Sequence, residues 1–142
     1  MTNIIETVRS LLESYPDIAE VVGEIHIDFA DPEPTSYGLT SEGDTLIAED
    51  ILGNQTRQHS FVLYSTFSGI NDFERLQNSG ALLRLTHWLH EQRDIPVIHE
   101  EHPGVMKSIR AENGMLYNVP QENAADGMQY HLQIIAVYTI ES

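Results

Sequence analysis

The stretch YHLQIIAVYTI, residues 130–140, alternates between two sets of side chains along its whole length. Successive side chains of an extended strand point to opposite faces, so each set lies on one face. One face is almost entirely apolar, with Tyr130, Leu132, Ile134, Ala136, Tyr138 and Ile140. The other face includes Ile135 and Val137, and apolar residues on both faces are typical of an interior strand. We therefore expect a long central strand, around which the rest of a sheet is built.

Three further segments have the pattern of strands. Residues 55–67 carry apolar side chains on both faces and are expected to form a second central strand. Residues 25–29 alternate as a half-buried strand that ends at Asp31-Pro32. Within residues 109–119, the dipeptide Asn113-Gly114 predicts a tight hairpin, because both central residues of such a turn need a positive φ.

Two segments have the apolar spacing of helices. Residues 3–15 predict an amphipathic helix, with Asn3 and Glu6 as a capping pair and Pro16 at its end. A second helix is expected from about Asn71 to Arg93. Together with the strands, these helices predict an α+β fold: an antiparallel or mixed β-sheet with two main helices packed on one face.

The second helix is apolar on two sides. One stripe contains Phe73, Leu76, Gly80 and Leu83, whereas the other contains Leu82, Leu85 and Leu89, with Trp88 to one side. A helix of this kind needs two packing partners. One partner is the sheet of its own subunit, and the other is either a neighbouring subunit or a tightly wrapped core. Leu82, Leu85, Trp88 and Leu89 are therefore candidates for an oligomer interface.

The segment 31–53 is polar and acidic. Glu42, Asp44, Glu49 and Asp50 surround the short apolar stretch at residues 46–48. This pattern predicts either a mobile loop or arm, or a hairpin strand that enters a turn at Gly53-Asn54. Adjacent carboxylates on a strand face opposite sides, so we interpret these residues as a solvated face and not as a catalytic pair.

Length and composition exclude several classes of protein. A chain of 142 residues fits one domain, spanning 1–142, and the absence of cysteine removes disulfides, thiolate nucleophiles and sulfur-based zinc sites. Seven Lys and Arg against 22 Asp and Glu give a net charge of −15, which repels a phosphate backbone. No apolar run reaches the roughly 20 residues that cross a bilayer. We expect a soluble protein made in a cytoplasm, without membrane partners or tight nucleic-acid binding.

Two histidine clusters raise the question of metal binding. His99-Glu100-Glu101-His102 offers four ligands in a row, but adjacent ligands on a loop rarely converge on one ion, which favours an exposed loop. His87 and His90, followed by Glu91, are near one another on the second helix but need a third ligand. We expect no metal or cofactor; a small metal-binding or metal-dependent hydrolase domain that uses His87 and His90 is the alternative.

The chain lacks the sequence motifs of common catalytic machinery. It contains no Gly-x-Ser-x-Gly elbow, no glycine-rich phosphate loop, and no serine or threonine in a context that singles it out. The sequence therefore gives no support for an enzyme, and we expect the protein not to be one.

Four segments, taken in order, resemble a family of small phage proteins. They are DPEPTSYG (31–38), RQHSFVLYSTFS (57–68), FERLQNSGALLRLTHWLHEQ (73–92) and GMLYNVPQENAADGMQYHLQIIAVYTIES (114–142). The family comes from siphophages and prophages of Gram-positive bacteria, and its members are minor capsid, tail-terminator or tail-completion proteins. The likeness covers most of the chain, and it is carried by the order of the motifs, none of which is specific alone. Residues 95–111 depart from it, since relatives have a shorter, more basic and glycine-rich stretch there.

The resemblance implies a structural virion protein. Its expected role is a hexameric ring that terminates the tail tube and joins it to the head connector, at the head-proximal end of the tail. Expected partners are other copies, the tail tube protein and the head-tail connector protein, while DNA passes through without specific binding. A head-completion adaptor, one ring nearer the capsid, is the alternative within the same particle.

The same resemblance assigns roles to particular segments. The two-sided helix, the edge strands and Pro34, Thr35, Ser36 and Tyr37 would supply a head-to-tail interface. Glu42, Asp44, Glu49 and Asp50 would line a lumen that repels DNA. The arm at 31–53 and the loop at 99–104 would become ordered on meeting the tube or the connector.

Overall fold

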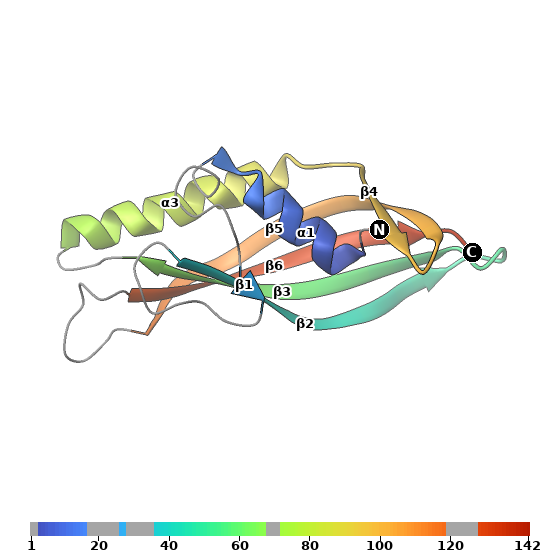
Figure 1. Cartoon of the computed structure of the whole chain (residues 1–142), viewed down its shortest axis with the longest axis horizontal. Coiled ribbons are helices and arrows are strands. Elements are labelled where there is room, and N and C mark those ends of the chain that lie inside the picture. Colours follow the sequence, from blue (N-terminus) through green and yellow to red (C-terminus); the bar gives the residue numbers. More distant parts are fainter. Residues whose placement is uncertain (1–2, 17–25, 28–35, 68–71, 119–127) are drawn as a thin grey trace.

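The computed structural model describes residues 3–16, 26–27, 36–67, 72–118 and 128–142. The elements in chain order are α1 (Ile4–Glu13), β1 (His26–Ile27), β2 (Ser36–Glu49), β3 (Gln55–Phe67), α3 (Asp72–His90), β4 (Ile95–His99), β5 (His102–Asn118) and β6 (Met128–Ile140). They form the expected α+β fold, in which a long, curved sheet is covered by the two helices (Figure 1). None of the helices in the described ranges has the length and apolar character needed to span a membrane.

The sheet is mixed, and the described strands follow the order β1-β2-β3-β6-β5-β4. The two-residue strand β1 runs parallel to β2, whereas the other neighbouring strands are antiparallel. β3 and β6 lie at the centre and pair along their whole length, from Gln55 opposite Ile140 to Phe67 opposite Met128. The prediction of two long central strands is therefore confirmed.

The core lies between the helices and one face of the central strands. Phe61, Leu63, Leu132 and Ile134 alternate onto this face and are at most 1% exposed. Complete burial of one such side chain contributes roughly 1.5–3 kcal/mol. The alternation that the sequence shows in β3 and β6 is thus the pattern that fixes which face carries the helices.

Helix α1 follows the sequence prediction closely. Its N-cap is Asn3, whose side-chain oxygen accepts a hydrogen bond of 2.9 Å from the backbone N–H of Glu6. Val8 and Leu12, one turn apart, are fully buried against the sheet. The capping interaction satisfies one of the amide groups that the first turn of a helix leaves unpaired, and so it sets where α1 begins.

Helix α3 corrects the expected oligomer interface. Leu82, Leu85 and Leu89 are at most 5% exposed inside the subunit, and the ring of Trp88 packs on Tyr15 with 4.9 Å between ring centroids. The second partner of this helix is therefore the subunit core, including Tyr15 just after α1, which was the other alternative. Leu83 points outward and is 57% exposed, whereas the side chains of Phe73 and Leu76 lie outside the described residues.

The predicted hairpin at Asn113-Gly114 is wrong. β5 runs through these residues without a turn and pairs with β6 on both sides of them. The register shifts between Glu112 and Met115, so the two residues are accommodated as an irregularity in the strand. An irregular strand residue needs the same backbone freedom that a turn needs, and β6 pairs with β5 from Gly104 to Asn118, on both sides of the irregularity.

The acidic segment and the histidine loop are ordered hairpins. Residues 36–49 form β2, so the hairpin strand is confirmed and the mobile arm is wrong for this part; residues 31–35 lie outside the described residues. β4 and β5 form the second hairpin, whose turn residues Glu100 and Glu101 have φ values of 46° and 74°. Residues 99–104 therefore consist of a tight turn at Glu100 and Glu101 and the paired strand ends beside it, and not of an irregular loop.

Candidate functional site

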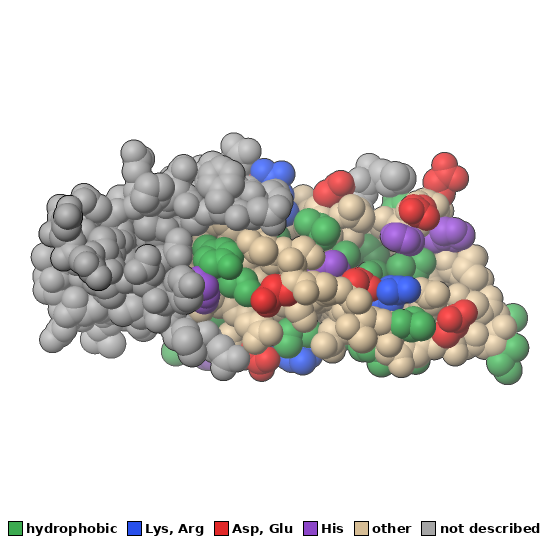
Figure 2. Space-filling model, turned by 90° about the horizontal axis from the view of Figure 1, so that it is seen from below, with side chains coloured by type: hydrophobic (Ala, Val, Ile, Leu, Met, Phe, Trp, Pro, Cys, Tyr) green, Lys and Arg blue, Asp and Glu red, His purple; other side chains and the backbone are tan. Residues whose placement is uncertain are grey.

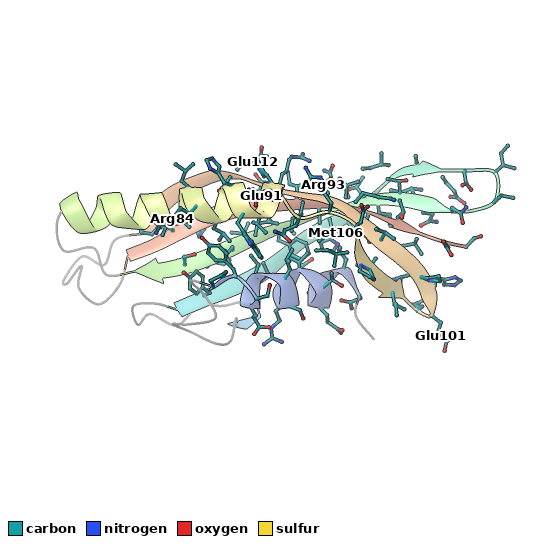
Figure 3. All side chains as sticks on the ribbon, turned by 90° about the horizontal axis from the view of Figure 1, so that it is seen from above. Arg84, Glu91, Arg93, Glu101, Met106 and Glu112 are labelled. Carbon is teal, nitrogen blue, oxygen red and sulfur yellow. The ribbon has the colours of Figure 1, made fainter. Side chains whose placement is uncertain are left out.

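The two hairpins diverge at the end of the sheet where the C-terminal residues lie (Figure 3). A cleft of about 630 Å³ opens there, which is within the roughly 300–1,000 Å³ of many ligand-binding clefts. Its walls come from the start of α1, the two hairpins and the end of β6. The lining residues are Asn3, Ile4, Ile5, Asp44, Gly53, Gln55, Arg57, His59, Val97, Ile98, His99, Glu100, His102, Tyr138, Ile140, Glu141 and Ser142.

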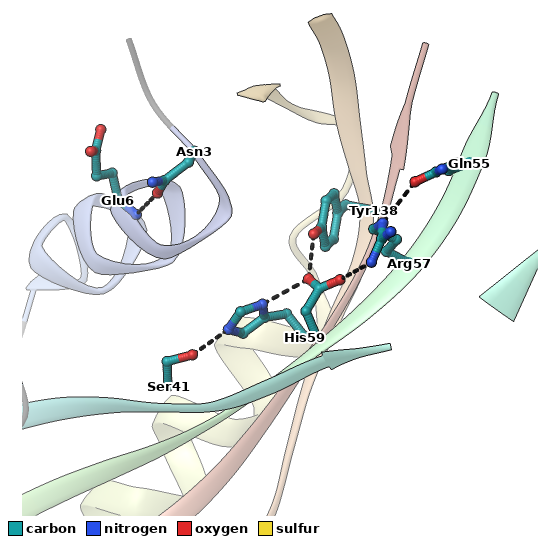
Figure 4. A network of polar contacts seen from close by, with 8 residues as sticks. Asn3, Glu6, Ser41, Gln55, Arg57, His59 and Tyr138 are labelled. Atoms are coloured by element: carbon teal, nitrogen blue, oxygen red, sulfur yellow. Dashed lines mark hydrogen bonds and ion pairs between the residues drawn. The ribbon is translucent and has the colours of Figure 1, made fainter. Parts of the chain in front are cut away.

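A polar network centred on Asp44 forms part of this lining (Figure 4). One carboxylate oxygen of Asp44 accepts a hydrogen bond of 2.8 Å from Arg57. The other oxygen lies 2.8 Å from Nδ1 of His59 and also accepts a hydrogen bond from the hydroxyl of Tyr138. On the far side of the imidazole, Nε2 of His59 lies 2.5 Å from the hydroxyl of Ser41.

The pairing of three strands brings these side chains to one face. Asp44 lies opposite His59 in the β2–β3 ladder, and Arg57 lies opposite Tyr138 in the β3–β6 ladder. The register of β2 shifts between Ser41 and Gly43, which changes the alternation by one residue. Ser41 and Asp44 are three positions apart and would lie on opposite faces of a regular strand. Because of the register shift, they lie on the same face.

The network fixes the protonation states of two of its members. Burial alone would raise the pKa of Asp44, but the hydrogen bonds from Tyr138, Arg57 and His59 outweigh it and lower that pKa below its usual value. Burial, and then the neighbouring Asp44 carboxylate, raise the pKa of Tyr138. At neutral pH the site therefore holds an ionised carboxylate and a neutral phenol that donates to it.

The bonding order Ser41–His59–Asp44 is that of a nucleophile, a base and an orienting acid. Two features separate it from a hydrolytic triad. Ser41 does not line the cleft, and the charge of Asp44 is already paired with Arg57. The arrangement is well suited to a structural role, because it ties β2 to the centre of the sheet through side chains of β3 and β6.

A second feature is the tip of the β2–β3 hairpin, residues 50–54, which we call the tip. The carboxylate of Asp50 accepts three hydrogen bonds, from the backbone N–H groups of Leu52 and Asn54 and from the side-chain amide of Asn54. Ser142 adds two more, one to the Asn54 side chain and one to the carbonyl of Leu52. The tip is therefore stabilised by hydrogen bonds among its own polar groups and from Ser142.

This ordered tip presents apolar side chains to solvent. Ile51 is 103% exposed and Leu52 is 77% exposed, and Ile47 further down β2 is 52% exposed. Figure 2 shows hydrophobic side chains at this end of the molecule. A single exposed leucine needs no explanation, but adjacent large aliphatic residues on a rigid protrusion are typical of a surface that a partner covers.

The four acidic residues expected in a lumen divide into different roles. Glu42 and Glu49 are exposed along β2, where they remain candidates. Asp50 orders the tip. The expectation for Asp44 is wrong. Its side chain is only 24% exposed and contacts Arg57, His59 and Tyr138, because the irregularity in β2 turns it toward β3 and β6.

The expected interface at residues 34–37 is also revised. Tyr37 is 8% exposed and belongs to the core, so it is wrong as an interface residue. Pro34 and Thr35 lie outside the described residues, and of Ser36 only the backbone, at the start of β2, is described. Tyr37 and Leu39 of β2 point into the core, so the side chain of Tyr37 is not accessible to a neighbouring subunit.

The histidines are dispersed. His87 and His90 are exposed on α3, and Nε2 of His90 lies 3.4 Å from the backbone N–H of Ala111. His99 and His102 are exposed cross-strand partners beside the turn of the β4–β5 hairpin. Within the described ranges, no three His, Asp or Glu side chains gather as a metal site would require.

Sequence reasoning missed the network, and of the tip it predicted the turn at Gly53-Asn54 but not the exposed Ile51 and Leu52. The network depends on a one-residue irregularity in β2 and on a hydrogen bond between Asp44 and Tyr138, which are 94 positions apart. The available signal for the tip was Asp50 four residues before Asn54, a pair that forms local turns. The sequence matches no family model and no curated protein, so the resemblance to phage proteins rests on the motifs quoted above.

Proposed function

We propose that this protein is a structural subunit of a phage particle, of the tail-terminator type, which works by assembling into a ring. The observation that carries the proposal is the ordered tip that exposes Ile51 and Leu52. The resemblance carried by the order of the sequence motifs is the basis for three parts of the proposal: the kind of particle, the hexameric ring and the partners. The partners are other copies, the tail tube protein and the head-tail connector. The place of action is the head-proximal end of the tail in the virion.

The energetics of the tip favour binding. Burying Ile51 and Leu52 against a partner would contribute roughly 1.5–3 kcal/mol for each side chain. Binding by a flexible loop loses part of such a gain to ordering, whereas the hydrogen bonds of Asp50 and Ser142 have already ordered this one. A small contact surface can therefore be sufficient in a ring, because every subunit makes the same contact with its neighbour.

The sheet edges are poorer candidates for the interface. β2 beyond Leu39 has no neighbouring strand on its outer side among the described residues, but it carries two register irregularities and the charges of Glu42 and Glu49. The opposite edge strand, β4, contains Pro96, which cannot donate a backbone hydrogen bond. Irregularities, charges and proline are the devices that prevent edge-to-edge pairing, so the tip is the better interface.

The charge of the chain fits a channel for DNA. Glu42 and Glu49 lie on the exposed part of β2, in a chain of net charge −15. If the rings place β2 toward the lumen, these carboxylates repel phosphates, and the duplex passes without adhering.

The tip variant Ile51→Asp with Leu52→Asp tests the proposal. Two charges at the interface are expected to weaken self-association by about 10-fold or more, which corresponds to at least about 1.4 kcal/mol. The melting temperature should stay within error of the wild type, because both side chains are exposed in the subunit. Sedimentation velocity over a range of concentrations measures the association.

The matched control is Leu83→Asp. Leu83 is 57% exposed on α3, so the substitution adds a charge at an exposed leucine outside the hairpin that carries the tip. Unchanged association of Leu83→Asp beside a defective tip variant supports the proposal, and equal effects of the two variants contradict it. Pull-down by purified tail tube protein or by connector protein then separates a terminator from a head-completion adaptor.

A hydrolase is a second candidate, favoured by one observation, the Ser41–His59–Asp44 bonding order. An active serine would react with a fluorophosphonate probe, and the label would be found on Ser41 by peptide mass spectrometry. The structural role that we assign predicts no labelling above that of a Ser41→Ala variant. Labelling that disappears in Ser41→Ala and in His59→Ala would establish the hydrolase instead.

A further inference from the structure

We propose that the cleft is the receptor for the tip of a neighbouring copy of this chain. The inference rests on the proposed function and names its interface: Ile51 and Leu52 of one subunit dock between the diverging hairpins of the next. Both halves of the contact are then present on every copy, on different surfaces. A contact of this kind is head-to-tail, and it forms a closed ring when the rotation between neighbours closes.

The two surfaces match in chemistry. The cleft lining includes aliphatic residues from three elements: Ile4 and Ile5 of α1, Val97 and Ile98 of β4, and Ile140 of β6, of which Ile4, Val97 and Ile140 are at most 7% exposed. Ile98 is 37% exposed, so part of this apolar wall faces solvent in the single subunit. The tip offers two aliphatic side chains on a narrow protrusion, which is the complement of a concave apolar wall.

A subunit does not fill its own cleft with its own tip. Gly53 is part of the cleft lining, but Ile51 and Leu52 are not, so the apolar side chains point away from it. The hydrogen bonds from Ser142 to Asn54 and Leu52 hold the tip in that orientation. Ile51 and Leu52 of the same subunit are therefore not the occupant of its cleft.

The charges of the cleft select a neutral occupant. His99 and His102 lie beside Glu100, and Glu141, after the end of β6, donates a backbone hydrogen bond of 2.8 Å to the carbonyl of Pro103, next to His102. Arg57 is engaged by Asp44 at 2.8 Å, so it is not a free cation for an acidic ligand. An anionic partner such as a phosphate backbone would meet the carboxylates of Glu100 and Glu141, whereas Ile51-Leu52-Gly53 is uncharged and the carboxylate of Asp50 is satisfied within its own turn.

Complementation between two defective variants tests the inference. The first is the tip variant, Ile51→Asp with Leu52→Asp, which retains an intact cleft. The second is a cleft variant, either Ile98→Asp, which charges the apolar wall, or His99→Trp, which blocks the cleft with bulk at an exposed position. Two different cleft variants are used so that misfolding of one does not decide the result; circular dichroism and thermal melting verify the fold of each.

The expected result is specific to a head-to-tail contact. Each variant alone associates about 10-fold or more weakly than the wild type. An equimolar mixture forms a heterodimer, because the intact tip of the cleft variant docks in the intact cleft of the tip variant. Growth stops there, since the remaining tip and cleft are both defective, and native mass spectrometry reads the composition directly.

Three results would overturn the inference. One is a mixture that remains monomeric although the wild type assembles; the proposed function then stands and the tip docks elsewhere. Another is wild-type association in both folded cleft variants, which assigns the tip to a different surface or to the tube protein. The third is a wild type that neither self-associates nor binds tail tube protein, which removes the proposed function as well.

Discussion

Replacing Gly104 with alanine is expected to destabilise the fold by about 3 kcal/mol, the largest effect that we predict for a single methyl group. A Cβ at Gly104 would overlap the backbone carbonyl oxygen of Thr139 and would lie 3.2 Å from Cγ2 of Val97. The clash is with backbone in the β5–β6 ladder, where Val105 pairs with Thr139, so no side-chain rotation relieves it. Urea denaturation followed by circular dichroism measures the loss.

The matched control for that substitution is Gly80→Ala. Gly80 lies inside α3, and the nearest atom to an added methyl group would be Nη1 of the Arg84 side chain at 3.7 Å, an ordinary contact. Alanine in a helix interior is more favourable than glycine by roughly 0.5–1 kcal/mol, so this variant should be more stable than the wild type. Equal stability of Gly104→Ala and the wild type would show that β5 does not approach β6 this closely.

Replacing Asp44 with asparagine is expected to cost about 2 kcal/mol at neutral pH. The asparagine side chain would lose the ion pair with Arg57 and would present an amide N–H₂ to groups that donate hydrogen bonds, above all Tyr138. Hydrogen bonds to a charged partner contribute roughly 1.5–3 kcal/mol, and the network is partly solvated, which reduces their sum. The free energy of unfolding in urea measures the effect.

The same variant carries a pH dependence with a defined sign. The pKa of Asp44 is lower in the folded protein than its usual value of 3.8, so the folded state favours the ionised form. Its contribution to stability is complete above that usual value and is lost as the pH falls through the lower folded pKa. The difference between the wild type and Asp44→Asn should therefore be constant above about pH 5 and shrink below about pH 4.

Glu42→Gln is the control for removing a carboxylate charge from β2. Glu42 is exposed on the same strand, two residues before Asp44, and the stability of this variant should match the wild type at neutral pH. A difference between wild type and Asp44→Asn that persists unchanged in acid would mean that the contribution of Asp44 does not come from its ionised carboxylate.

The fold was predictable where periodicity is simple. The alternation in residues 130–140 indicated the central strand, and the apolar spacing in residues 3–15 indicated α1 with its Asn3 cap. The hairpin predicted at Asn113-Gly114 was wrong, because a dipeptide that tolerates a turn also tolerates an irregular strand when a long partner strand such as β6 is present. Whether such a dipeptide forms a turn or an irregular strand depends on tertiary strand pairing, which the local sequence does not specify.

The candidate site was less predictable than the fold. The leucines of α3 looked like an interface because a helix that is apolar on two sides can pack its second side on another subunit or on its own subunit core. Asp44 looked unpaired because the register shift that brings it to Arg57, His59 and Tyr138 is invisible in the sequence. Ile51 and Leu52 were overlooked because two apolar residues in a turn form no periodic pattern, and only the structure shows that nothing in the described part of the subunit covers them.

Electron microscopy of the purified chain mixed with tail tube protein is the decisive experiment for the proposed ring. We expect closed rings of the chain that cap the ends of the tubes, and we expect the tip variant not to form them. A chain that stays monomeric at high concentration and leaves the tube ends bare would contradict it.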